Sequence, residues 1–281
     1  MKAIISHDID HLTVWEHTHD LILPKFIIRA HIELVLGKIS LLEYSYRVKD
    51  FFKNKWQQID ELIGYNISMG VPSFFFIGVN NGVGLSYPLE KASYWIHKLT
   101  EQNIELGVHG IAYDSFEKVN EEFELFKNIS SLSSFGIRMH YVRNDGNTLN
   151  YIEKSGYCFD STEHAFKNPY KIGNLWEFPF QIMDGWILNN NKPWQSQNLE
   201  QAKYNTLLLI DKAQKENIEY LGIIFHDRYF SNSFKTWKNW YIWLIDYLKS
   251  NKIEFVNFKQ AIQKLESINN EPAHTHSIFP S

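Results

Sequence analysis

The feature that most constrains this chain is the repeated alternation of short apolar runs with segments of helical periodicity. The runs are rich in β-branched and aromatic residues, as expected of strands that are buried on both faces. They lie at 3–5, 72–78, 104–109, 135–140, 157–160, 175–180, 220–226 and 255–258. Such alternation produces βαβ units around a parallel sheet.

Several of the intervening segments have the spacing of amphipathic helices. In 114–129, apolar residues recur at intervals of three and four after Asp114 or Ser115, either of which is a suitable N-cap. Similar patterns cover 87–100, 199–216 and 236–249. Seven or eight strand–helix units predict an α/β barrel, and 281 residues are enough for one, since such barrels need about 250.

The chain reads as one domain with one irregular segment. No linker or low-complexity tract interrupts residues 1–268, and residues 269–281 read as a tail. Residues 12–70 exceed what a minimal barrel needs, and their pattern predicts a helical insertion after the first strand. Within it, the Leu- and Ile-rich stretch 21–42 either packs over the barrel or forms a helix that contacts a membrane surface or a partner.

Composition excludes several classes of protein. The formal net charge is −4, so a nucleic-acid partner is not expected. The single cysteine, Cys158, excludes a disulfide framework or a cysteine metal cluster within one chain. We find no apolar stretch of roughly 18 residues and no signal peptide, so we expect no spanning helix and a cytoplasmic location.

The first strand ends in two acids on one face. In parallel barrels the functional side chains come from the carboxyl ends of the strands. Asp8 and Asp10 close the first strand, and period-two alternation directs them to the same side. Two carboxylates this close need a cation, a shared proton or a nearby arginine, and a hard metal ion is a natural partner for one of them.

Other strand ends carry histidine and arginine. His109 closes the third strand, Arg138 and His140 share one face of the fourth, and His226 closes the seventh. A single histidine at a strand end is more often structural than catalytic. Three of them, with paired acids and an arginine, predict an active site at the mouth of the barrel.

The order of these motifs resembles the polysaccharide deacetylase superfamily, the NodB-homology group of carbohydrate esterases. The similar segments are 6–10, 73–78, 104–109, 137–140 and 223–227. The long first insertion and the His-Asp-Ile-Asp-His start most resemble a branch found among O-antigen and capsule biosynthesis proteins. The resemblance implies a distorted (β/α)7-type barrel. It also implies a hydrolase that removes an N- or O-linked acetyl group from a sugar or glycan in surface polysaccharide metabolism.

The resemblance also implies roles for individual residues. Asp8 would be the general base, oriented by Arg138, and His226 the general acid. Asp10 and His109 would hold a divalent metal ion, expected to be zinc.

The chain departs from the family pattern at the third metal ligand. Tyr113 stands where the family has its second metal histidine, and tyrosine is a poor zinc ligand. Asp114 or His140 could replace it, and we favour Asp114. His140, which stands where the family has a proline, is then expected to contact substrate together with Glu177 and Asp227.

Two other functions remain open at this point. One is a metal-independent glycan hydrolase that uses Asp8 and Glu177, whose carboxylates would then face each other across a sugar. The other is a catalytically inactive barrel that binds a glycan or serves as a scaffold.

Overall fold

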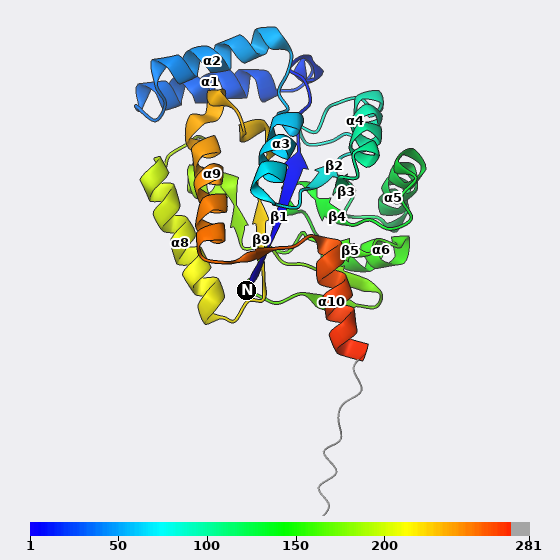
Figure 1. The fold of residues 1–281 in the computed structure, drawn as a ribbon. Coiled ribbons are helices and arrows are strands. Elements are labelled where there is room, and N and C mark those ends of the chain that lie inside the picture. The colour runs from blue at the N-terminus through cyan, green and yellow to red at the C-terminus, as the bar shows by residue number, and fades with distance from the viewer. Residues whose placement is uncertain (271–281) are drawn as a thin grey trace, which may run out of the picture.

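The fold is seen in a computed structural model that describes residues 1–270 (Figure 1). The predicted tail at 269–281 lies outside the described residues apart from its first two positions, which end the last helix. A single sheet runs through the described chain, and we therefore propose that residues 1–268 form one domain.

The sheet contains ten strands in the spatial order β6-β7-β5-β4-β3-β2-β1-β9-β8, with β10 paired to β1. Every pairing is parallel except that of β6 with β7. The strands are β1 (Lys2–Ile9), β2 (Phe74–Ile77), β3 (Glu105–Gly110), β4 (Ile137–Met139), β5 (Phe159–Asp160), β6 (Tyr170–Ile172), β7 (Leu175–Glu177), β8 (Ile182–Met183), β9 (Tyr220–Ile224) and β10 (Glu254–Phe255). The predicted distorted α/β barrel is confirmed.

Helices surround this curved sheet (Figure 1). The helices are α1 (Ile22–Val35), α2 (Leu41–Lys53), α3 (Ile59–Met69), α4 (Leu89–Glu101), α5 (Phe116–Ser130), α6 (Thr148–Ser155), α7 (Asp184–Asn189), α8 (Leu199–Lys215), α9 (Lys235–Ser250) and α10 (Phe258–Asn270). None of those within residues 1–270 is long and apolar enough to cross a bilayer.

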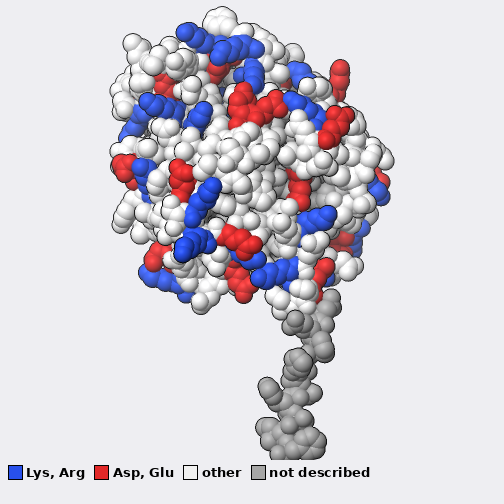
Figure 2. All heavy atoms as spheres, viewed as in Figure 1, with Lys and Arg blue, Asp and Glu red and all other residues white. Residues whose placement is uncertain are grey.

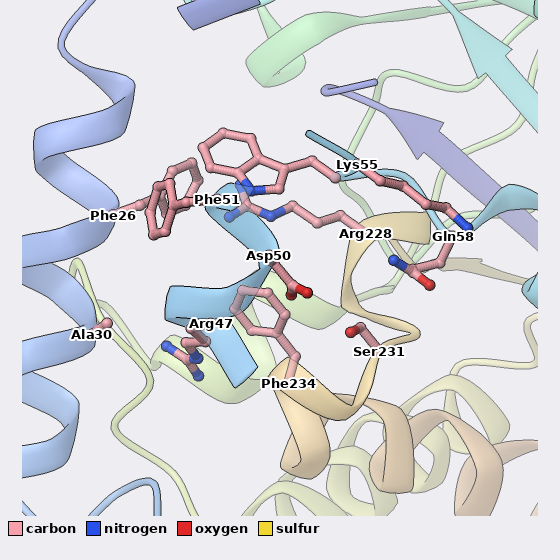
Figure 3. Close-up of a pocket in the computed structure, with 11 residues that line it drawn as sticks. Phe26, Ala30, Arg47, Asp50, Phe51, Lys55, Gln58, Arg228, Ser231 and Phe234 are labelled. Carbon is pink, nitrogen blue, oxygen red and sulfur yellow. The ribbon is translucent and has the colours of Figure 1, made fainter. Parts of the chain in front are cut away.

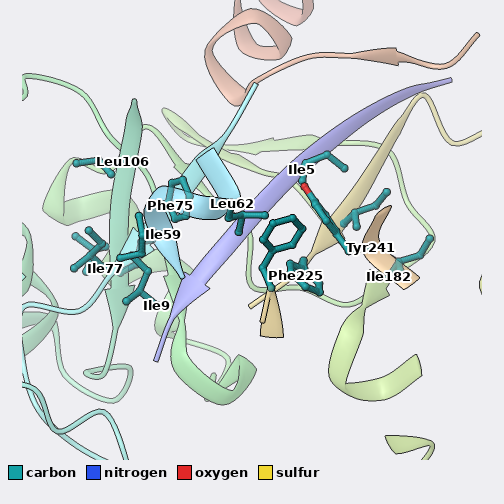
Figure 4. Close-up of a cluster of buried hydrophobic side chains, with 14 of the residues drawn as sticks. Ile5, Ile9, Ile59, Leu62, Phe75, Ile77, Leu106, Ile182, Phe225 and Tyr241 are labelled. Carbon is teal, nitrogen blue, oxygen red and sulfur yellow. The ribbon is translucent and has the colours of Figure 1, made fainter. Parts of the chain in front are cut away.

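The segment 12–70 divides into two parts with different roles. Helix α3 occupies the ordinary crossover position between β1 and β2, and Figure 4 shows its Ile59 and Leu62 in one apolar cluster with Ile9 and Phe75. Helices α1 and α2 form a hairpin that lies above the sheet in Figure 1. The true addition to the barrel is therefore this hairpin and its flanking loops.

A second apolar cluster fills the inside of the sheet. Phe74 and Phe76 of β2 meet Phe159 of β5 and Phe258 of α10, and the rings of Phe159 and Phe258 stack 4.1 Å apart. The sequence predicted a strand at 255–258, but β10 ends at Phe255. The reason is reciprocal capping: the Gln260 backbone N–H donates to the Asn257 side chain, and the Asn257 N–H donates to the Gln260 side chain.

We expect the substitution Phe258→Ala to destabilise the fold by about 3–5 kcal/mol, because it removes a fully buried ring from the interior cluster. Urea unfolding followed by circular dichroism measures this change. Ile268→Ala, on the exposed side of the same helix, is the matched control and should change the free energy of unfolding by no more than about 0.5 kcal/mol. Equal effects of the two substitutions would contradict the proposed packing.

Candidate active site

A pocket of about 470 Å³ lies at the carboxyl ends of the strands. It is lined by Asp8 and Asp10 from β1 and its extension, by His109 of β3, by Arg138 of β4 and by His226 after β9. Parallel strands place their carboxyl ends at one edge of the sheet, so residues up to 218 positions apart in sequence meet there. His7, which precedes Asp8 on β1, points the other way and binds the Phe225 carbonyl and Asn66.

Three side chains converge within this pocket. Asp10 Oδ1 lies 3.2 Å from His109 Nε2 and 3.3 Å from His140 Nδ1, and the two ring nitrogens are 3.0 Å apart. Each atom therefore lies at the corner of a small, nearly equilateral triangle. The histidines are buried, whereas Asp10 remains partly open to the pocket.

Backbone carbonyls fix which nitrogen of each ring faces the triangle. His109 Nδ1 lies 3.1 Å from the Arg138 carbonyl, and His140 Nε2 lies 3.2 Å from the Val83 carbonyl. A carbonyl can only accept, so each of these nitrogens carries a proton, and in the neutral ring the other nitrogen presents a lone pair. Two imidazole lone pairs and a carboxylate oxygen then face one another, an arrangement that a cation stabilises.

The donor set fits a divalent metal ion. Nitrogen and oxygen ligands at about 2.0–2.2 Å from zinc, in tetrahedral geometry, are about 3.3–3.6 Å from one another. The three observed separations, 3.0 to 3.3 Å, are close to this spacing. A metal-binding histidine also usually donates the N–H of its non-ligating ring nitrogen to a carbonyl or carboxylate.

Asp114 does not belong to this cluster. Its side chain is 53% exposed and lies 3.6 Å from Lys118, in the turn that leads into α5. The strand β3 ends at Gly110, so the chain has already left the mouth of the barrel when it reaches Asp114. His140 stands in the position that we had assigned to Asp114, because it shares the inward face of β4 with Arg138.

Asp8 is held by a buried arginine. Arg138 Nη1 donates to Asp8 Oδ1 at 2.8 Å, and the same guanidinium donates to the carbonyl and the hydroxyl of Ser161. Burial alone would raise the pKa of Asp8, but the charges of Arg138 and of the neighbouring histidines His109 and His226 together outweigh this and hold the pKa below its usual value. Asp8 is therefore a carboxylate oriented by Arg138, and it does not belong to the group formed by Asp10, His109 and His140.

His226 is paired with an acid that the sequence analysis did not identify. Asp184 Oδ1 lies 2.7 Å from His226 Nδ1, and Asp184 Oδ2 accepts the His226 backbone N–H at 2.8 Å. The other ring nitrogen, Nε2, faces Asp10 at 3.6 Å. Burial lowers the pKa of His226, but the carboxylates of Asp184, Asp10 and Asp8 outweigh it and raise the pKa well above 6.5.

Asp184 escaped notice because its strand is very short. It follows β8, a strand of two residues that has no recognisable alternation, and it begins the short helix α7. The only sequence signal was an isolated acid after Gln181-Ile182-Met183.

The other two predicted substrate residues lie outside this pocket. Trp176 and Phe178 point into the barrel, so Glu177 between them points outward, into a separate pocket with Asp160 beside α6. Asp227 is fully buried, and its Oδ2 accepts the Gln58 backbone N–H at 2.8 Å, which ties the start of α3 to the end of β9. Neither residue lines the pocket that contains Asp8 and Asp10.

A second group of donors, His11, Glu16 and His17, is already internally bonded. Glu16 accepts the backbone N–H groups of Leu12 and Thr13. His11 Nδ1 lies 2.9 Å from His17 Nε2, and His17 Nδ1 binds Asp20. These bonds shape the loop after β1 and leave fewer free lone pairs than the Asp10 cluster has.

Comparison with solved structures shows which proteins share this architecture. The chain matches a protein named as a polysaccharide deacetylase from Mycobacterium smegmatis with a TM-score of 0.61 and 11% identity, over 96% of this chain and 92% of that one. A polysaccharide deacetylase from Pseudomonas aeruginosa PAO1 matches with a TM-score of 0.58 and 13% identity, over 95% and 90%.

The fold is that of the polysaccharide deacetylases. It is shared by an enzyme of a different name, the Puue allantoinase, with a TM-score of 0.58 and 11% identity over 95% of this chain and 89% of that one. No protein-family model and no curated protein sequence matches the chain. The likeness therefore extends to the fold, and the chemistry depends on the residues of the pocket.

We expect Asp184→Asn to lower the pKa of His226, because it removes the carboxylate that is bonded to the ring. The folded pKa exceeds 6.5, so this pair stabilises the protein fully below pH 6.5, and the stabilisation is lost as pH rises through the raised pKa. NMR titration of the His226 ring in chelator-treated protein measures the shift. An unchanged pKa in the variant would show that Asp184 does not control the proton on His226.

Proposed function

We propose that this protein is a metal-dependent hydrolase that removes an N- or O-linked acetyl group from a sugar or glycan. One observation carries the proposal. A single pocket holds three converging lone-pair donors, Asp10, His109 and His140, beside an oriented carboxylate and a carboxylate-bound histidine. The named deacetylases that share the fold support the same reaction.

Asp10, His109 and His140 would hold the ion, and zinc suits a site with two histidines and one carboxylate. A divalent ion bound there would polarise an acyl carbonyl and lower the pKa of a water molecule. Three protein ligands leave a position open for substrate or water, as catalytic zinc sites do.

Asp8 and His226 have complementary charge states for acid–base chemistry. Asp8 is ionised and fixed by Arg138, so it can accept a proton from an attacking water. His226 retains its proton at neutral pH because of Asp184, so it can donate to the departing amine or hydroxyl. Groups whose environments separate their pKa values in this way are suited to act as base and acid in one reaction.

The rim of the pocket suits a sugar. Tyr141 and Trp186 line the pocket with their rings substantially exposed, and aromatic planes pack against the apolar faces of sugars. Tyr141 and its neighbour Val142 both have positive φ angles, 57° and 56°, a strained conformation that is maintained where it serves a site. The Tyr141 ring packs against the ring of His140, with the two ring centroids 4.2 Å apart.

The arrangement does not favour a metal-independent glycan hydrolase. That mechanism needs a second carboxylate across the sugar from Asp8, and Glu177 lies in a different pocket, behind the wall of the barrel. A role in surface polysaccharide metabolism and a cytoplasmic location stay predictions from the sequence.

We expect His140→Ala and Asp10→Ala each to weaken zinc binding by at least about 100-fold, because each removes a ligand rather than its support, whose loss alone costs 10–100-fold. Isothermal calorimetry on chelator-treated protein measures the affinity. Asp114→Ala is the matched control and should leave the affinity unchanged. If Asp114→Ala weakens binding while His140→Ala does not, the ligand set proposed here is wrong.

We expect Asp8→Asn to abolish deacetylation while it retains the metal and the fold, because Asp8 binds Arg138 and stands apart from the three metal-binding atoms. Release of acetate from acetylated chito-oligosaccharides and metal content by elemental analysis are measured on the same samples. Loss of metal together with activity would mean that Asp8, too, is a ligand. Absence of acetate release by the zinc-loaded wild type from both N- and O-acetylated sugars would favour the inactive-barrel alternative.

A further inference from the structure

The hairpin formed by α1 and α2 has an inverted distribution of polar and apolar residues. In an ordinary surface helix, apolar residues face the core and charged residues face water. In α1 the buried residues are Ala30 and Glu33, and in α2 they are Glu43 and Arg47. Charged side chains thus lie on the inward face of both helices.

These inward charges attach the hairpin to itself and to the barrel. Glu33 pairs with Arg29 at 2.8 Å and with Arg47, and Arg47 also donates to Glu43 and to the Ser233 carbonyl. The Gln195 backbone N–H donates to Glu33 at 2.7 Å. The network joins α1, α2 and the segments that flank α8 and α9.

Aromatic stacking completes the inner face (Figure 3). The Arg228 guanidinium of the barrel lies 3.7 Å from the ring centroid of Phe26 in α1 and 4.0 Å from that of Trp56. A second, smaller pocket lies between the hairpin and the barrel. Figure 3 shows Phe26 and Phe51 on its hairpin side and Phe234 on its barrel side. The hairpin is therefore held firmly through its polar and aromatic side.

The outer face of the hairpin is apolar. Leu21, which precedes α1, and Ile28 and Val35 of α1 are spaced seven apart and form one stripe, because seven residues complete about two turns. Val35 is 84% exposed and Ile28 is 59% exposed. On α2 and its start, the exposed apolar residues are Leu41, Leu42, Val48 and Phe52, the last 83% exposed.

A tryptophan extends this surface. The Trp15 backbone N–H donates to Asn54 at the end of α2, and the Trp15 side chain is 56% exposed. Tryptophan is enriched where proteins meet the headgroup region of membranes.

The accessible charges on the hairpin are positive. Residues 21–55 contain seven lysines and arginines but only three acids, although the whole chain carries a net charge of −4. Glu33 and Glu43 are buried, and Asp50 binds Ser233, while Lys25, Lys49 and Lys53 are exposed. Figure 2 shows several Lys and Arg side chains, with a few acidic ones below them, over the end of the molecule where Figure 1 places this hairpin.

From the apolar outer face, the lysines beside it and the buried acids, we propose that the α1–α2 hairpin docks the protein on a membrane surface that contains anionic lipids. A helix with an apolar face flanked by lysines lies in the interface plane of a bilayer, where apolar burial and headgroup attraction act together. The network of Glu33 and Arg47 holds the hairpin in place, so the apolar face is presented without unfolding.

The docking surface adjoins the catalytic pocket. Ile22, Lys25, Phe26 and Arg29 of α1 line that pocket. One helix would therefore contact both the lipid surface and the substrate. This position suits a sugar carried on a lipid anchor. That suggestion about the substrate rests on the proposed function, whereas the docking of the hairpin on a membrane does not rest on it.

Flotation of the purified protein with vesicles tests the proposal. We expect binding to vesicles of phosphatidylglycerol and phosphatidylcholine, weaker binding to phosphatidylcholine alone, and weakening by salt. Each lysine near an anionic surface strengthens binding about fivefold, so Lys49→Glu with Lys53→Glu should reduce it by at least about tenfold. The combination Ile28→Ser, Val35→Ser, Val48→Ser and Phe52→Ser should abolish it.

Matched controls are Ile67→Ser on α3 and Leu208→Ser on α8, which replace similarly exposed apolar residues elsewhere and should leave vesicle binding unchanged. Circular dichroism verifies folding. Should the fourfold variant misfold, Val35→Ser and Phe52→Ser alone, at the most exposed positions, should each give a partial loss.

Binding that is absent in the wild type, or equal in the hairpin and control variants, would overturn the proposal. Analytical ultracentrifugation distinguishes the other occupant: a dimer that these substitutions dissociate, without vesicle binding, would assign the face to a second copy of the chain. The readout is binding, so an inactive enzyme that docks leaves the proposal intact and refutes only the proposed function.

Discussion

The pocket at the carboxyl ends of the strands depends on three side chains, Asp10, His109 and His140, that the fold brings together. The carbonyls of Arg138 and Val83 accept hydrogen bonds from the outer N–H groups of His109 and His140, so the inner nitrogens of the two rings face each other and Asp10. With both rings neutral and no cation present, this arrangement is electrostatically unfavourable, and with a cation it becomes a preorganised site. The pairing of parallel strands keeps the three side chains from separating to relieve it.

The remaining charges are arranged so that they do not compete for this site. Asp8 is neutralised by Arg138 on one side, and His226 is bound to Asp184 on the other. Arg138 keeps Asp8 ionised, and Asp184 favours the protonated form of His226. Two acids that alternate along one strand, Asp8 and Asp10, thus come to have different partners and different proposed roles, because their neighbours on other strands differ.

The hairpin shows the same principle on a larger scale. Its acids are used internally, where Glu33 and Glu43 neutralise Arg29 and Arg47, and this leaves lysines and apolar side chains outside. Buried ion pairs contribute little to stability by themselves, but they can fix which face of an element points inward. In this hairpin, the inward position of the charged residues leaves apolar side chains exposed to water on the outer face.

The sequence by itself determined the barrel, the inward face of β1, and the meeting of His109, Arg138 and His226 at its mouth. Each of these follows from a local rule, either strand–helix alternation or period-two parity at a strand end. The tertiary structure alone decided that His140 rather than Asp114 joins Asp10. It also places Asp184 beside His226 and directs Glu177 into a separate pocket. These outcomes depend on where each strand stops and which strand lies next to it, since β3 ends before Asp114 and β8 is too short to show a period. Strand ends and strand neighbours are set by packing between distant segments, which no local pattern records.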